Sequence, residues 1–208
     1  MLSALLGLGV VGCGSGSSSS TATAGSRPPS HHSSASSTSG GVSAGGAALS
    51  AEAQSAATGD IPDNQVFLTF SNPVAGYSMS YPEGWARKGA GSDVAFADKN
   101  NLVHVVVAKG AAPTPAGVQA QLTALQQSYP TLKFTAPHTV GLKSGTAVRA
   151  RYTTESAPNP VTGKRVLLIV DRYELSHAGK RAIVDLGTPK GVDNVDAYRM
   201  MINSFRWL

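Results

Sequence analysis

Hydrophobic and polar positions alternate along several stretches of the chain beyond residue 61, and this period of two predicts β-strands. Between residues 77 and 81, for example, Tyr77, Met79 and Tyr81 alternate with Ser78 and Ser80. The same kind of pattern predicts strands over residues 65–70, 77–81, 94–97, 102–108, 133–141, 146–154, 165–175 and 181–186. Because most of the connections are short, we expect neighbouring strands to be antiparallel.

Periods of three and four residues predict two helices, over residues 115–128 and 193–204. In the first, Val118, Leu122, Leu125 and Tyr129 form one apolar stripe, and Pro130 ends the helix. In the second, one side carries Val195, Tyr198, Ile202 and Phe205.

Together these elements predict an α+β domain over residues 61–208. We expect an antiparallel β-sheet flanked by helices on both faces, an αβα sandwich. The apolar run Val166–Val170 is continuous, so its strand is expected to be covered on both faces. A domain of roughly 145 residues buries nearly 70% of its unfolded surface, which is enough for stability without disulfides.

The region before the domain has a different composition. An apolar run ends in Val10-Val11-Gly12-Cys13, and small residues before a cysteine resemble the lipobox of bacterial lipoproteins. We therefore expect residues 1–12 to be a signal peptide and Cys13 to carry a diacylglyceryl group. The alternative is a short buried apolar segment with an incidental thiol. A leader of this kind normally begins with Lys or Arg, so we expect the true start to lie upstream.

Residues 13–60 consist mostly of Ser, Gly, Ala and Thr, and predict a disordered linker behind the lipid anchor. A coil of this kind has a root-mean-square reach of roughly 35–40 Å. His31 and His32 lie in this tract without further ligands, so we expect no metal site there. The predicted location is the extracytoplasmic face of the cell membrane.

Charge excludes one class of function. Lys and Arg number 17 against 12 Asp and Glu, which gives a net charge of +5 and a pI near 9.5. The basic residues are not clustered and are not interleaved with aromatic residues, so we expect no nucleic-acid partner.

Two motifs at opposite ends of the domain resemble one fold family. Tyr81-Pro82-Glu83-Gly84-Trp85 closes an aromatic strand, and Met201-Ile202-Asn203-Ser204-Phe205-Arg206-Trp207 ends the chain. These stretches are similar to the PsbP-like fold, which is shared by the PsbP subunit of photosystem II, a Ran-binding protein family and the LpqN-type lipoproteins of actinobacteria. The resemblance covers residues 66–207 and implies a non-catalytic protein that docks on a complex or carries a ligand. Tyr81, Pro82, Trp85 and Phe205 are its structural signature.

Candidate chemistry is sparse. Within residues 61–208 there is no Gly-x-Ser-x-Gly elbow, His-Glu-x-x-His, P-loop or dinucleotide fingerprint. His104, His138 and His177 lie on three separate predicted elements, and we expect no catalytic residue, metal or cofactor. Asp193 and Asp196 straddle the start of the last helix, where carboxylates interact favourably with the helix dipole.

Arg149 and Arg151 are the candidate binding residues. They alternate on one face of a strand, and a hairpin centred near Pro160 would place Arg149 opposite Asp171. A cross-strand ion pair is one interpretation. The other is a cleft for an anionic or lipid headgroup, in which Arg151, the less easily paired arginine, is the better candidate.

These observations lead to three hypotheses. The first is a lipid-anchored extracytoplasmic binding or accessory protein that docks on a partner in the membrane or cell envelope. The second is a carrier of a small molecule or lipid in an apolar pocket between sheet and helix. The third is a hydrolase of cell-envelope substrates, which is disfavoured because no catalytic constellation is present.

Overall fold

The computed structural model describes residues 59–158 and 163–208. The predicted leader, Cys13, His31, His32 and nearly all of the predicted linker lie outside these residues, as does the tip of the hairpin near Pro160. In the described part, no helix is long and apolar enough to cross a membrane.

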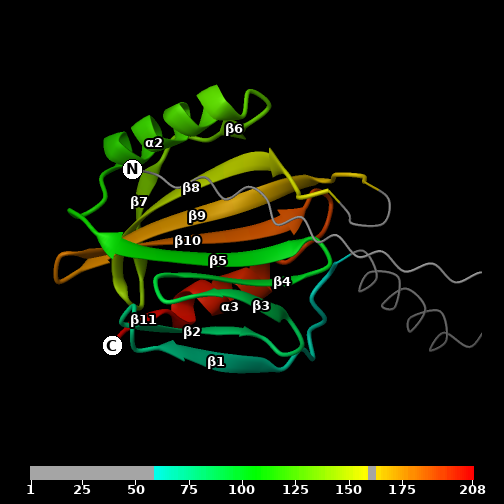
Figure 1. Cartoon of the computed structure of the whole chain (residues 1–208), viewed down its shortest axis with the longest axis horizontal. Helices are drawn as coiled ribbons and strands as arrows, with labels where there is room; N and C mark the ends of the chain where they lie inside the picture. Colours follow the sequence, from blue (N-terminus) through cyan, green and yellow to red (C-terminus); the bar gives the residue numbers. More distant parts are fainter. Residues whose placement is uncertain (1–58, 159–162) are drawn as a thin grey trace, which may run out of the picture. The chain divides into compact units, whose positions relative to one another are not determined.

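The described chain forms eleven strands and two helices (Figure 1). The first half contains β1 Phe67–Asn72, β2 Tyr77–Pro82, β3 Ala86–Ala90, β4 Asp93–Asp98, β5 Asn101–Lys109 and α2 Pro115–Ser128. The second half contains β6 Lys133–Phe134, β7 His138–Leu142, β8 Gly145–Glu155, β9 Leu167–His177, β10 Lys180–Pro189, α3 Val195–Ser204 and β11 Arg206–Trp207.

The strands form two antiparallel sheets. The larger sheet has eight strands in the order β3-β4-β5-β10-β9-β8-β6, with β7 also paired to β8. The smaller sheet has the order β1-β2-β11, so the last strand of the chain pairs with the strand that opens the domain. The prediction of antiparallel neighbours is confirmed for every strand pair of the described chain.

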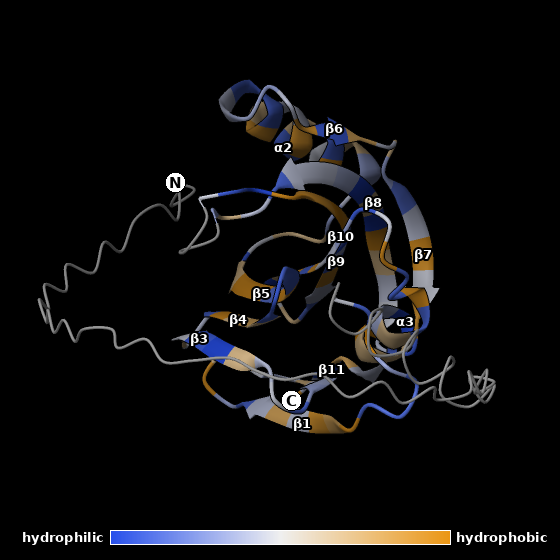
Figure 2. Cartoon of the chain, turned by 90° about the vertical axis from the view of Figure 1, so that its right-hand side faces the viewer, coloured by the Kyte–Doolittle hydropathy of each residue, from blue (hydrophilic) through white to orange (hydrophobic). Residues whose placement is uncertain are grey.

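The predicted αβα sandwich is wrong. Strands hold 50% of the described residues, and the two helices hold 16%. A sheet path of seven strands is roughly 30 Å wide at ~4.8 Å per strand, whereas a helix is only ~10 Å across. One helix therefore covers a small part of a face: α2 packs against β8, while α3 packs against β2 beside the smaller sheet (Figures 1 and 2). The fold is a mostly antiparallel β structure in which the second layer is itself a sheet.

The hydrophobic core has two parts. The larger part joins the smaller sheet and α3 to β4, β5 and β10, and Val103, Val105 and Val184 are completely buried in it. The smaller part lies where α2 meets β8 and β9, and it contains Val118 and Leu122 of the predicted helix stripe. The stripe ends earlier than expected, because Tyr129 is exposed.

The strand through residues 166–170 is not covered on both faces, as its apolar run had suggested. Leu168 and Val170 are buried in the α2 part of the core, but Leu167 is 40% exposed. On the same side of β9 as Leu167, Ile169 is only half-buried. The continuous apolar run therefore predicted burial correctly for only one face of this strand.

Candidate functional site

Arg149 and Arg151 both bind one carboxylate. Arg149 donates to Asp171 Oδ1 from Nε at 3.1 Å and Nη2 at 2.8 Å. Arg151 donates to Oδ1 from Nε at 3.1 Å and to Oδ2 from Nη2 at 2.8 Å. In the strand register Arg151 lies directly opposite Asp171, while Arg149 lies opposite Tyr173. The predicted hairpin was centred near residue 160, whereas the observed register is centred on residue 161. Moving the centre of a hairpin by one residue changes the residue opposite any given position by two.

Because both arginines are paired with Asp171, their guanidinium groups are less available to a ligand. Arg151 was expected to be the less easily paired arginine, yet its hydrogen bond to Asp171 raises its guanidinium pKa. Arg149 also lies 5.6 Å from the centroid of the Tyr173 ring. A ligand anion here would compete with Asp171 for both side chains. Their binding role stays a prediction.

The four signature residues lie at the junction of the two sheets. Trp85 and Phe205 are buried in the larger part of the core, and Phe205 stacks on Tyr77 with ring centroids 5.5 Å apart. Tyr81 is half-buried. The carbonyl of Pro82 accepts a hydrogen bond from Trp85 N at 3.3 Å, which closes the turn that leaves β2.

The structure does not bring the three histidines together. His104 on β5 contacts Asp93 Oδ1 at 2.8 Å, and His177 at the end of β9 stacks on Trp207. His138 on β7 is exposed and lies opposite Arg149. Within residues 59–158 and 163–208, no group of three His, Cys, Asp or Glu side chains is placed to hold a metal ion.

A polar cluster, which sequence reasoning missed, lies on the face of β8, β9 and β10 that carries the α2 part of the core. Arg172 donates to Asp185 from Nε at 2.8 Å and from Nη2 at 2.7 Å, and Tyr152 donates to Asp185 Oδ2 at 3.2 Å. Burial, the largest single effect, lowers the pKa of Arg172, but the charge and hydrogen bonds of Asp185 together with Tyr152 and Glu174 raise it by more. Burial, the largest effect, and Asp185 together raise the pKa of Tyr152. Arg172 and Asp185 therefore form a buried ion pair, and the hydroxyl of Tyr152 donates a further hydrogen bond to its carboxylate.

Glu174 lies on the same face of β9, and its carboxylate has weaker interactions with its surroundings than that of Asp185. Its side chain is 0% exposed, and neither carboxyl oxygen has a hydrogen-bond partner among the described residues. The nearest cation is Arg181, with Nε 3.7 Å from Oε2. Burial raises the pKa of Glu174, whereas the charges of Arg172 and Arg181 lower it by less, and the charge of Asp185 adds to the increase.

We expect Glu174 to make folding stability depend on pH. Its pKa in the folded state is above the ordinary value of 4.5, so the folded protein binds this proton more tightly than the unfolded chain. The free energy of unfolding should therefore fall as pH rises from 4.5 through the raised pKa. Glu174→Met should remove this dependence and stabilise the protein at pH 7 by about 1–3 kcal/mol, the cost of an unsatisfied buried polar group.

This effect is measured by urea unfolding of the parent protein, Glu174→Met and Glu155→Met at several pH values. A range of ~4–8 includes the pH values at which most proteins are maximally stable. Glu155→Met is the matched control because Glu155 is exposed at the end of β8. Equal stability changes for the two variants at every pH would contradict the assignment.

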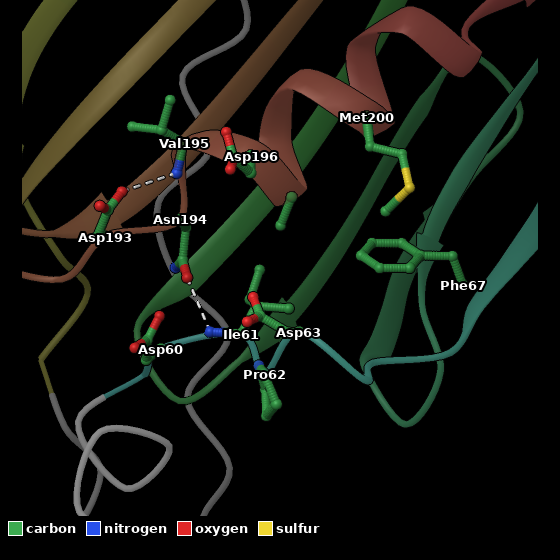
Figure 3. Close-up of a pocket in the computed structure, with 11 residues that line it drawn as sticks. Asp60, Ile61, Pro62, Asp63, Phe67, Asp193, Asn194, Val195, Asp196 and Met200 are labelled. Atoms are coloured by element: carbon green, nitrogen blue, oxygen red, sulfur yellow. Dashed lines mark hydrogen bonds between the residues drawn. The ribbon is translucent and has the colours of Figure 1, made fainter. Parts of the chain in front are cut away.

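A third feature is a hollow beside the N-terminus of α3, here called the acidic hollow (Figure 3). It has a volume of about 750 Å³ and is lined by the segment before β1, by Phe67 of β1 and by the start of α3. Four of its lining residues are aspartates: Asp60, Asp63, Asp193 and Asp196.

Asn194 holds the two walls of the acidic hollow together. Its Oδ1 accepts a hydrogen bond from the backbone N of Ile61 at 2.8 Å, which Figure 3 shows. Its Nδ2 donates to Asn101 Oδ1 at 3.0 Å and to the carbonyl of Gly59 at 3.1 Å. Since Asn194 is itself buried, this network attaches the segment that enters the domain to the loop before α3.

Two apolar side chains at the acidic hollow are exposed. Val195 is 59% exposed and Met200 is 48% exposed, although the sequence pattern placed Val195 on the buried side of the helix. The buried residues of α3 are Tyr198, Met201 and Ile202. Asp193 and Asp196 do lie at the helix start as predicted, and Asp193 Oδ1 accepts from Val195 N at 3.2 Å.

A second hollow, the basic hollow, adjoins the acidic hollow along α3. It has a volume of about 460 Å³ and is lined by Lys143, Asp196, Arg199, Met200, Asn203, Ser204 and Arg206. The two hollows share Asp196 and Met200. We call the two hollows together with Val195 and Met200 the α3 surface. No sequence motif marks it, because its residues come from five parts of the chain: the segment before β1, β1 itself, the turn between β7 and β8, α3 with the loop before it, and β11.

Comparison with known proteins gives similarity only at the level of structure. No family model matches the chain, and no curated protein matches it. The chain is similar to a cyanobacterial PsbP. The solution structure of PsbP (CyanoP) from Synechocystis sp. PCC 6803 aligns with a TM-score of 0.48 and 15% identity, over 72% of this chain and 98% of that one.

Two further structures give comparable values. The Ran-binding protein Mog1p of Saccharomyces cerevisiae aligns with a TM-score of 0.46 and 8% identity, over 68% of this chain and 95% of that one. A crystal structure from Bacteroides thetaiotaomicron aligns with a TM-score of 0.44 and 17% identity, over 67% of this chain and 48% of that one. PsbP and a Ran-binding protein both belong to the group that the sequence motifs resembled. All three TM-scores are below 0.5, so the function proposed next depends on the chain's own residues.

Proposed function

We propose that this protein is a lipid-anchored, non-catalytic binding protein of the extracytoplasmic membrane face, and that its domain docks on a protein of the cell envelope. The observation that carries the proposal is the α3 surface, where the exposed side chains of Val195 and Met200 adjoin the acidic hollow. Exposed apolar side chains that are contiguous with a hollow are typical of interaction sites, whereas scattered ones are not.

The anchor and tether are the second part of the proposal. A diacylglyceryl group on Cys13 holds the chain at the membrane, and residues 13–60 let the domain search for its partner at a distance. This arrangement is that of an LpqN-type lipoprotein, in line with the motifs at Tyr81 and Phe205.

A lipid carrier fits the acidic hollow poorly. Such a carrier needs a mostly apolar lining, because an apolar ligand cannot satisfy carboxylates that it removes from water. The acidic hollow has four aspartates in its lining and lies between the segment before β1 and α3. Docking of a protein surface leaves these carboxylates at a hydrated rim.

Removing the anchor tests the location. We expect Cys13→Ala to shift the protein from the membrane fraction to the soluble fraction when cells are lysed and centrifuged, because no thioether can form. Ser15→Ala, two residues further along, is the matched control and should stay with the membranes. Retention of Cys13→Ala in the membrane fraction would refute the lipid anchor.

Site-specific crosslinking in intact cells tests the docking surface. We expect Met200→p-benzoylphenylalanine to give a discrete protein adduct on irradiation, and Tyr129→p-benzoylphenylalanine to give none. Tyr129 is also an exposed large side chain, but it follows α2, away from the α3 surface. Adding Val195→Asp should abolish the adduct. An adduct that persists with Val195→Asp, or that forms equally from position 129, would contradict docking at this surface.

A further inference from the structure

The α3 surface changes the sign of its charge across Met200. The acidic hollow holds Asp60, Asp63, Asp193 and Asp196, and no Lys, Arg or His is among its lining residues. The basic hollow shares Asp196 and Met200 with the acidic one, and its other charged lining residues are Lys143, Arg199 and Arg206. The chain as a whole is basic, with a net charge of +5, so four of its 12 acidic residues at one hollow are a marked local excess.

Most of these charges are not neutralised within the domain. Only Asp196 and Arg199 pair with each other, at 2.6 Å between Oδ1 and Nη2, and both are highly exposed. Among the described residues, no ion pair involves Asp60, Asp63 or Asp193, and none involves Lys143 or Arg206. Exposed charges of this kind contribute to orientation and association rate more than to affinity.

The apolar residues between the two charged regions supply the anchor point. Met200 lines both hollows, while Val195 and Phe67 line the acidic one. A flexible methionine at an exposed site adapts to different apolar side chains. A large apolar side chain of a partner that enters beside Met200 would remove this surface from water, and such central apolar contacts carry most of the affinity of an interface.

We infer that the α3 surface binds a protein segment in which a large apolar side chain separates a basic end from an acidic end. The basic end lies against the four aspartates, the apolar side chain contacts Met200 and Val195, and the acidic end lies against Lys143 and Arg206. This inference rests on the proposed docking function and adds the chemistry and the direction of the partner segment.

Nuclear magnetic resonance with synthetic peptides tests the inference. The full chain carrying Cys13→Ala, labelled with ¹⁵N, is titrated with a peptide of two lysines, glycine, leucine, glycine and two glutamates in that order. We expect saturable shifts of the amide signals of Val195, Asp196 and Met200. Replacing the leucine by glycine, or both lysines by glutamate, should weaken binding at least several-fold.

Matched variants locate the binding. Asp63→Lys should weaken binding several-fold, and Asp98→Lys, at the aspartate that ends β4 and whose side chain is 45% exposed, should leave it unchanged. Met200→Ser should weaken binding, and Tyr129→Ser should not. Binding should also fall as salt is raised, because the complementary charges are exposed.

Three results would overturn the inference: no shift at about 1 mM peptide, the weak end of specific recognition; equal shifts with the all-acidic peptide; or the same shifts produced by phosphatidylglycerol vesicles without peptide. The crosslinking experiment separates this failure from failure of the proposed function. An adduct from position 200 with no peptide selectivity leaves the docking function standing, whereas loss of the adduct removes both.

Discussion

Replacing Arg172 by methionine should lower the free energy of unfolding by about 3–5 kcal/mol, the cost typical of leaving one member of a buried ion pair alone. Arg172 and Asp185 are joined by two hydrogen bonds of 2.8 and 2.7 Å, and both side chains are largely buried. Methionine keeps an unbranched apolar stem but has no positive charge and no hydrogen-bond donor. Asp185 would keep only the hydroxyl of Tyr152, and Glu174 would lose one of its two nearby cations.

Two further variants make this expectation specific. The double variant Arg172→Met, Asp185→Leu should recover most of the loss, because an apolar pair of similar volume often replaces a buried ion pair at no cost. Arg199→Met removes an exposed ion pair instead and should cost at most ~1 kcal/mol. Urea unfolding followed by circular dichroism gives all three values. If Arg172→Met costs no more than Arg199→Met, the buried pair does not have the role assigned to it.

Replacing Phe205 by alanine should cost about 3–5 kcal/mol, the usual range for a large aromatic residue in a core. Phe205 is completely buried. Its ring stacks on Tyr77 at 5.5 Å and meets Trp207 edge-on at 5.3 Å. These contacts join the end of α3 and β11 to β2, so the cavity would open at the junction that closes the smaller sheet.

Leu208→Ala is the matched control for this prediction. Leu208 is also apolar and lies three residues further along, but it is 65% exposed, so its removal should change stability by less than ~0.5 kcal/mol. Thermal unfolding monitored by tryptophan fluorescence measures both variants, because Trp85 and Trp207 both lie at the larger part of the core. A small and equal loss for both variants would show that the end of the chain does not contribute to the core.

The local hydrophobic pattern predicted an element correctly where the interactions that stabilise the element are between residues close together in the sequence. Alternation predicted β2 correctly, and Tyr77 and Met79 on one side of it are buried. The first helix begins at Pro115 and ends at Ser128 as predicted. Thr114 accepts a hydrogen bond from Gly117 N at 3.1 Å, so the helix start is stabilised by a residue adjacent to it.

The same reasoning failed where a distant part of the chain decides the outcome. Residues 133–141 were predicted to be one strand, but the structure has two short ones, β6 and β7, with Thr135, Ala136 and Pro137 between them. Hydrophobic alternation predicted neither β3 nor β11. β3 has no buried residue, so it shows no apolar alternation, and it exists because β4 provides hydrogen-bond partners. β11 exists because β2 does.

The sequence by itself determined the strands with clear alternation, the two helices and the antiparallel pairing, because each depends on side chains or connections only a few residues apart. Only the tertiary structure decided that a second sheet, and not a helical layer, covers the larger part of the core. It also decided that Asp171 serves two arginines, that Glu174 is buried beside α2, and that Asp63 and Met200 belong to one surface. These features join residues that are distant in the chain, and their contacts follow from strand order and register, which hydrophobic periodicity does not encode.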